Sequence, residues 1–426
     1  MSRNESGRHV FHDSTRRLQA DLPFRQGMVM KIAAITTCFR YRSHAHVLLE
    51  NFLEPYLFNG RKIVPGQQVV SLYVDQCTKS DMSREVAKRY GIRIYPTIAA
   101  ALCRGKSRLD VDAVLLIAEH GRYSFNRLGQ KRYPRKRFFD RIVEVMRSSG
   151  RAVPVFVDKH LSYRWDWARQ MVDTSRELGM PLMAGSSVPL AQRKIPLELP
   201  RGAKIVEAVS VHGGPIEAYG FHALELLQSQ VESRQGGETG VVSVEALAGE
   251  KLWNGDWSRP LAEAAMAAEL GKPLRSLKRI PGETASPSRG VILRYADGLK
   301  ATMLTVGKSD MRWNFACRLK GERQPRATNY YVGPWQNRNL FKALAHAIQY
   351  HFRTARAPYP VERTLLTTGL IDAFMHARKK SGPFPTPHLQ FSYTPRNFKA
   401  MREMGATWQI VTEDMPEPKG IDSFCG

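Results

Sequence analysis

Residues 153–165 read Val-Pro-Val-Phe-Val-Asp-Lys-His-Leu-Ser-Tyr-Arg-Trp, and the interpretation of the whole chain starts from this stretch. A short β-branched and aromatic run stops at Asp158-Lys159-His160, and a helix-like segment follows. An apolar run this short between helical patterns is typical of a buried strand in a parallel sheet. Ligands bind at the carboxyl ends of such strands, which favours Lys159 and His160 as site residues. The alternative is that Asp158 caps the next helix and Lys159 is solvated.

The same alternation of strand and helix extends from residue 31 to about residue 180. It predicts a doubly wound, Rossmann-like parallel sheet in which the crossovers are right-handed. The expected strands are residues 32–35, 69–74, 92–95, 111–118 and 153–157, and the expected helices are residues 44–57, 83–90, 97–103 and 135–148.

After Pro181 the pattern changes to strands without regular intervening helices, which predicts a second α/β domain with a large open mixed or antiparallel sheet. Its expected strands are residues 204–212, 241–247, 290–295, 300–306 and 311–318, with helices at 218–232, 336–355 and 361–380. The predicted organisation is a disordered extension (1–29), a Rossmann-like domain (30–180), an α/β substrate and oligomerisation domain (181–395) and a C-terminal tail (396–426).

Composition excludes some functions more firmly than others. The formal net charge is +25, but the basic residues are spread along the chain, and the densest cluster, 131–137, precedes a helix and is interpreted as a solvated face. No nucleic-acid-binding motif is present, so we expect no specific nucleic-acid partner.

No apolar run is long enough to cross a bilayer, so no membrane role is expected. The five cysteines show no CxxC spacing, which predicts neither a metal site nor disulfides and favours a cytoplasmic protein.

Polar residues follow other strands of the predicted parallel sheet. Glu119-His120 follow the strand at 111–118 and could bind substrate or move protons. Asp75 follows the strand at 69–74, where a carboxylate can bind the ribose hydroxyls of NAD or simply cap a turn. The first loop holds Thr36, Thr37, Cys38 and Arg40 in place of a glycine fingerprint. Arg40 either binds a phosphate there or is an exposed loop residue.

In the second domain, Gly220-Phe221-His222-Ala223-Leu224-Glu225 falls within a predicted helix. Phe221, Leu224 and Glu225 recur at helical spacing, so His222 could point into the cleft between the domains. A histidine beside an apolar stripe is also common as a core residue.

Taken together, these segments resemble the Gfo/Idh/MocA family, the relatives of glucose–fructose oxidoreductase and inositol dehydrogenase. The resemblance rests on Asp75, on the segment Tyr90–Tyr95, and on Asp112-Ala113-Val114. Asp158-Lys159-His160 stands where the family has Glu-Lys-Pro, and Gly220–Glu225 stands where it has G-x-H-x-x-D. The chain departs from the family in its glycine-free first loop and in Ala218, which replaces an acid.

The resemblance implies hydride transfer between NAD or NADP and a hydroxyl of a sugar-like or polyol substrate, with Lys159 and His222 catalytic. It also implies a homodimer or homotetramer, since open sheets in such second domains pair face to face. We expect Glu119, His120, His160, Tyr163 and Glu225 at the substrate, and Thr36, Thr37, Cys38, Arg40 and Asp75 at the cofactor. Two alternatives are a diverged protein without an exchangeable dinucleotide (a binding or regulatory protein, a lyase or a hydrolase) and an anionic-polymer binder.

Overall fold

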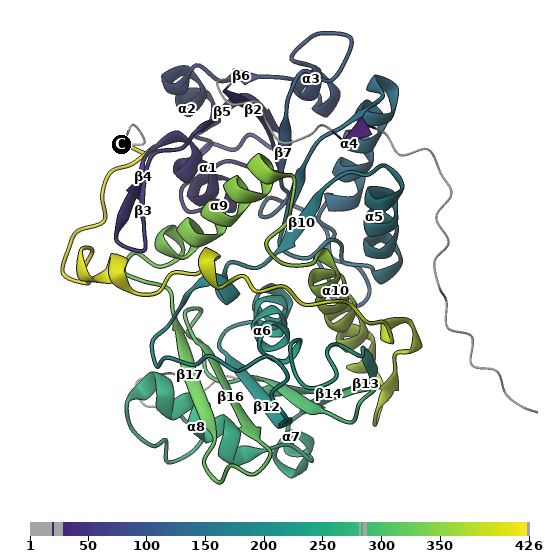
Figure 1. The fold of residues 1–426 in the computed structure, drawn as a ribbon, viewed down its shortest axis with the longest axis vertical. Helices are drawn as coiled ribbons and strands as arrows, with labels where there is room; N and C mark the ends of the chain where they lie inside the picture. The colour runs from purple at the N-terminus through teal and green to yellow at the C-terminus, as the bar shows by residue number, and fades with distance from the viewer. Residues whose placement is uncertain (1–18, 21–28, 281–282, 284–287, 424–426) are drawn as a thin grey trace, which may run out of the picture.

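Two β-sheets organise the chain in this computed structural model, which describes residues 19–20, 29–280, 283 and 288–423 (Figure 1). The first sheet has six strands, and every neighbouring pair in it is parallel. Its order is β10 (Leu182–Gly185), β9 (Val155–Asp158), β7 (Ala113–Ile117), β2 (Met30–Thr36), β5 (Gln67–Val74) and β6 (Arg93–Ile94). The chain winds outward in both directions from β2, so the predicted doubly wound sheet is confirmed.

Helices cover both faces of this sheet because the strands are apolar on both sides. Ile32 and Ala34 of β2 face one core, whereas Ala33 and Ile35 face the other. The first core includes α1 (His44–Leu53), α2 (Ser83–Tyr90) and α9 (Asn337–Thr354); the second includes α3 (Ile98–Cys103), α4 (Arg135–Ser149) and α5 (Trp165–Glu177).

The second sheet has eight strands and is mixed, as the sequence predicted. Its order is β11 (Gln192–Arg193), β17 (Arg326–Tyr331), β16 (Trp313–Leu319), β12 (Ile205–His212), β15 (Lys300–Thr305), β14 (Arg289–Tyr295), β13 (Val241–Ala248) and β18 (Phe384–Pro385). The central pair β12–β15 is parallel and the other pairs are antiparallel.

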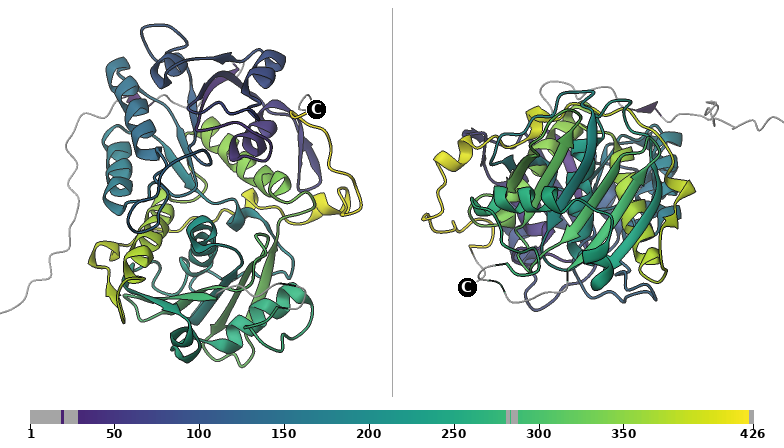
Figure 2. Two further views of the ribbon diagram at one scale, coloured as in Figure 1. Left: turned by 180° about the vertical axis from the view of Figure 1, so that it is seen from behind. Right: turned by 90° about the horizontal axis from the view of Figure 1, so that it is seen from below.

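Helices lie on both sides of the eight-stranded sheet (Figure 2). On the side of the first domain lie α6 (Ile216–Val231) and α10 (Val361–Ala377). On the other side, α7 (Glu250–Asn254) and α8 (Arg259–Leu270) pack on β13, β12, β16 and β17 and bury Val209 and Val211 of β12. Helices α7 and α8 were not expected from the sequence, and together they cover the face that an open sheet would leave free for a second copy.

Three details differ from the expected organisation. The edge strand β10 lies beyond residue 180 and still belongs to the first sheet. Helix α9 was expected to interrupt the second sheet, but it packs on α1. The family resemblance also implies a last strand at 389–393, after the helix at 361–380, but a 3-10 turn, Pro387–Leu389, leads into an irregular segment there.

The remaining elements are short. They are β1 (Gln19–Ala20), which pairs with β8 (Arg151–Ala152), the hairpin β3 (Tyr56–Phe58) and β4 (Arg61–Ile63), and the turns Val188–Leu190, Lys399–Met401 and Ala406–Gln409. Apart from 19–20 and 29, the predicted N-terminal extension lies outside the described residues. Among the helices of the described part, none is both long and apolar enough to cross a membrane.

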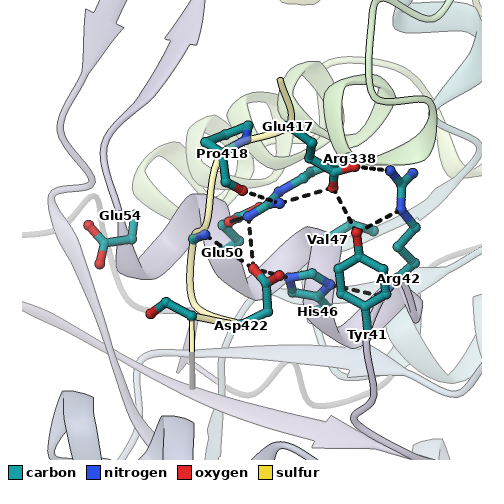
Figure 3. A network of polar contacts seen from close by, with 12 residues as sticks. Tyr41, Arg42, His46, Val47, Glu50, Glu54, Arg338, Glu417, Pro418 and Asp422 are labelled. Atoms are coloured by element: carbon teal, nitrogen blue, oxygen red, sulfur yellow. Dashed lines mark hydrogen bonds and ion pairs between the residues drawn. The ribbon is translucent and has the colours of Figure 1, made fainter. Parts of the chain in front are cut away.

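The C-terminal segment is held against α1 and α9 by a polar network with Arg338 at its centre, and Arg42 also binds Glu417 there (Figure 3). Arg338 of α9 binds both carboxylate oxygens of Glu50 and donates to Glu417 (3.0 Å) and Asp422 (3.0 Å). Glu50, Asp422 and His46 also lie close enough together for a metal site. The guanidinium of Arg338 already neutralises their carboxylates, so the cluster fastens the tail.

Candidate functional site

The candidate site lies at the carboxyl edge of the parallel sheet, where β7 and β9 end side by side. Glu119-His120 follow β7 and Lys159-His160 follow β9. Lys159 (φ 64°) and His120 (φ 69°) both adopt the left-handed backbone conformation, which non-glycine residues seldom adopt. Such strain is commonly found where a structure must aim a functional side chain.

The two strand ends are joined by a buried ion pair. Lys159 Nζ lies 3.0 Å from Glu119 Oε1, and each residue is only 7% exposed. Arg135, at the start of α4 and 1% exposed, binds the other oxygen of Glu119. Burial alone would raise the pKa of Glu119, but the charges of Lys159 and Arg135 hold it well below its usual range. Glu119 is therefore an anion between two cations.

Helix α6 of the second domain brings His222 to this edge. Lys159 Nζ also donates to the carbonyl oxygen of Ala218 (3.3 Å), one turn before His222. His222 Nδ1 lies 2.6 Å from Ser186 Oγ, in the segment that follows β10. Burial and the nearby charge of Lys159 keep the pKa of His222 well below its usual value, so its imidazole is neutral at pH 7.

A second pair lies beside the first. His44, the first residue of α1, places Nδ1 2.6 Å from Asp158 Oδ2, and both side chains are buried. The ring of His44 packs edge-on against that of His120 at 5.0 Å. Burial, followed by the charge of His44, lowers the pKa of His120 to about 3. The expected alternative for Asp158, capping the next helix, is wrong: Arg164 occupies the N-cap of α5, and no side-chain cap bond forms there.

His160 completes the cluster. Its Nε2 lies 3.3 Å from Arg135, and burial and that charge hold its pKa well below normal. The structure thus brings together five of the expected residues: Lys159, His222, Glu119, His120 and His160.

Sequence reasoning did not assign a role in the site to His44, Arg135 or Ser186. Arg135 lies in the basic cluster that is interpreted from the sequence as a solvated face. Its burial depends on its ion pair with Glu119, which follows strand β7. His44 meets Asp158 across 114 positions of sequence, so no local pattern could reveal that pair.

Two expected substrate residues lie elsewhere. Glu225 is fully buried between α6 and α10, where Thr367 donates to it (2.7 Å), and burial raises its pKa. Glu225 therefore packs α6 against α10. Tyr163 is half-buried and lines a separate pocket beside α4, described below.

The expected cofactor residues surround the ends of β2 and β5. Thr36, Thr37 and Cys38 are buried, and Thr37 donates to the backbone oxygen of Glu119 (2.6 Å), whereas Arg40 is exposed. Thr37 thus ties the first loop to the β7 loop, whereas Thr36 donates to the backbone oxygen of Tyr73 on β5 (3.1 Å). The loop offers no glycine for a pyrophosphate to approach.

Asp75 lies at the expected strand end, but both of its oxygens already accept hydrogen bonds. Tyr73 donates to Oδ1 (2.9 Å), Tyr123 of the β7 loop donates to Oδ2 (2.7 Å), and Arg137 lies 3.6 Å away. Backbone groups of Arg122 are also bonded to the side chain of Gln76 (2.8 and 3.1 Å). The adenosine end of a dinucleotide therefore does not fit Asp75 unless Tyr123 moves.

Comparison with solved structures identifies the same architecture in several other proteins. Myo-inositol dehydrogenase from Lactobacillus casei, solved with NAD(H) and myo-inositol, matches with a TM-score of 0.55 at 13% identity over 87% of this chain and 100% of that chain. GenD2 from gentamicin A biosynthesis, solved with NAD, matches with a TM-score of 0.53 at 11% identity over 86% and 99% of the two chains. An oxidoreductase from Agrobacterium radiobacter, solved with NAD+, L-tartaric acid and magnesium, matches with a TM-score of 0.51 at 12% identity over 84% and 98%.

At this level of identity the comparisons establish the fold. The expected two-domain fold, a doubly wound parallel sheet followed by an α/β domain with a mixed sheet, is confirmed, and the chain shares it with the myo-inositol dehydrogenase. No protein-family model and no curated protein sequence matches the chain.

Proposed function

We propose that this protein is an NAD(P)-dependent oxidoreductase that acts on a hydroxyl group of a sugar-like or polyol substrate. The observation that carries the proposal is the meeting of Lys159, Glu119 and His222 at the carboxyl edge of the parallel sheet, opposite the second domain. Ligand sites of open α/β sheets lie at this edge. The dehydrogenases with the same fold bind NAD, and one of them was solved with myo-inositol.

In this proposal, the residues of the chain position the hydroxyl group and hold its proton. Lys159, fixed by Glu119, donates a hydrogen bond to the substrate oxygen and stabilises negative charge that develops there. Neutral His222, oriented by Ser186, is the second group available for the proton. A bound dinucleotide would supply the hydride acceptor.

Calorimetric titration with NAD(H) and NADP(H), followed by turnover assays on a panel of polyols and aldoses, tests the proposal. We expect Lys159→Met to lose at least about a hundredfold in kcat with little change in stability, because Arg135 continues to neutralise Glu119. Turnover that survives this substitution would remove Lys159 from the mechanism.

A second candidate is a protein with the same proton-transferring cluster but no exchangeable dinucleotide. It is favoured by one observation, the hydrogen bonds from two tyrosine hydroxyls that Asp75 already accepts beside a glycine-free loop. The two candidates differ in a simple measurement. Mass spectrometry of the purified, denatured protein, together with the titration above, would detect NAD(P) only in the first case.

A further inference from the structure

A pocket of about 580 Å³ lies between α4, the start of α5 and the loop at 123–134. Its size is typical of small-molecule sites. Four aromatic side chains line it: Tyr123 and Tyr133 from the loop, and Tyr163 and Trp167 from the start of α5. Each pair makes an edge-on ring contact, at 5.7 Å and 5.3 Å respectively.

The same pocket carries more positive than negative charge. Its acids, Asp140 and Glu144, are already paired with two of its cations: Lys136 binds both oxygens of Asp140 (2.7 and 2.8 Å), and Arg141 binds Glu144 (2.7 Å).

Two further lining arginines are not neutralised in this way. Arg137 has a side chain that is 65% exposed, and its ion pair with Asp75 is longer, at 3.6 Å. Arg132 is exposed, and no carboxylate among the described residues lies within ion-pair distance of it. These two guanidinium groups are available to a ligand.

We propose that this pocket is a binding site for a phosphomonoester that carries a planar ring. The arginines provide the donors that bind phosphate oxygens in pairs. The aromatic side chains offer apolar faces and edges to a ring. The pocket adjoins the expected cofactor residue Asp75, which its lining residues Tyr123 and Arg137 contact, whereas Lys159, His222 and Glu119 do not line it.

The pocket is separated from the catalytic cluster by one layer of side chains. The guanidinium of Arg135 lies over the ring of Tyr133 at 4.8 Å, and the same group binds Glu119. A ligand that packs on Tyr133 therefore contacts the ring on which Arg135 lies. Arg135 in turn binds Glu119, which pairs with Lys159. The ligand of this pocket is either an effector or one end of an extended substrate. In both cases the pocket recognises a phosphorylated ring.

The test is calorimetric titration of the full-length protein with phenyl phosphate, phenol and inorganic phosphate at about 0.15 M salt, where long-range attraction is screened. Phenyl phosphate contains both recognition elements and resembles neither a dinucleotide nor a polyol. We expect it to bind at least about tenfold more tightly than phenol or inorganic phosphate. Arg132→Ser/Arg137→Ser and, separately, Trp167→Leu should each weaken its binding at least about tenfold.

Two controls locate the ligand. Arg323→Ser removes an exposed arginine outside the pocket and should leave the affinity unchanged. Lys159→Met should do the same, because Lys159 does not line the pocket. The proposal is overturned if inorganic phosphate binds as tightly as phenyl phosphate, if the double arginine variant binds like the wild type, or if Lys159→Met abolishes binding. Thermal unfolding of each variant checks that the fold is retained.

Discussion

Replacing Tyr123 by phenylalanine should strengthen dinucleotide binding. In the structure, Tyr123 donates to Asp75 Oδ2 at 2.7 Å, so its hydroxyl competes for this oxygen with any ribose hydroxyl that binds Asp75. Burial, and then this bond to a carboxylate, raise the pKa of the Tyr123 hydroxyl, so it remains a protonated donor at any working pH. A cofactor whose ribose binds Asp75 must first break that bond, whereas in Tyr123→Phe the oxygen is already free.

The magnitude follows from the kind of bond that is lost. A hydrogen bond to a charged group contributes about 1.5–3 kcal/mol net. The Asp75 side chain is 16% exposed and keeps its bond to Tyr73, so the lower end of that range applies. About 1.4 kcal/mol corresponds to a tenfold change in affinity, so Tyr123→Phe should bind NAD(H) about tenfold more tightly than the wild type.

The assay is calorimetric titration with NAD(H), with Tyr331→Phe as the matched control. Tyr331 also donates to a carboxylate, Glu413 at 2.8 Å, but it lies on β17 of the second sheet. That control should leave the affinity unchanged. Equal or weaker binding in Tyr123→Phe would refute the idea that Tyr123 competes with the cofactor. No detectable binding by either protein would favour the candidate without an exchangeable dinucleotide.

Three further predictions concern stability and assembly. Arg338→Met removes the guanidinium that binds the partly buried carboxylates of Glu50 and Asp422, whereas Glu417 keeps its ion pair with Arg42. The change should cost about 1.5–3 kcal/mol of unfolding free energy, read by urea denaturation, with faster proteolysis of the tail. Burial lowers the pKa of His212 and His351 to about 4, so the unfolded chain binds protons that the folded chain does not. Stability should therefore fall as the pH drops from 6.5 to 4, by about 3 kcal/mol for each histidine, and His212→Asn should make the fall shallower. Since α7 and α8 cover the outer sheet face, light scattering should give a monomer of 48.2 kDa, and a stable dimer would show that another surface assembles the protein.

The architecture could be predicted from the sequence because it depends on short-range patterns. Apolar runs such as 113–117 and 155–157 are buried on both faces and cannot be anything but interior strands once helices flank them. The polar residues that follow such runs are then placed at one sheet edge by topology alone, which is why Glu119 and Lys159 were found.

What could not be predicted depends on pairs that are distant in sequence. Arg135 carries a charge like its neighbours in the basic cluster, and only the position of Glu119 distinguishes it. The sequence favours Asp75 as a ribose ligand, because its hydrogen bond from Tyr123, 48 residues later, has no local sequence signal. Helices α7 and α8 lie between strands in a segment whose pattern we interpreted as strand and loop, so the covered sheet face was missed as well.

The charges at the edge of the parallel sheet also limit the chemistry that it can support. His120, His160 and His222 are neutral because burial lowers their pKa values, so the fixed charges nearest Lys159 are those of Arg135 and Glu119. Two cations, Lys159 and Arg135, share the carboxylate of Glu119 there, and the carboxylate of Asp158 is engaged by His44. Such a site stabilises an oxygen that gains negative charge, as an alkoxide does when a hydroxyl loses its proton. Stabilisation of a negatively charged oxygen is needed both for hydride transfer and for non-redox proton transfer, so the cluster favours an oxygen as the reacting substrate atom in either case. Whether Asp75 can bind the ribose of a dinucleotide then decides between the two reactions.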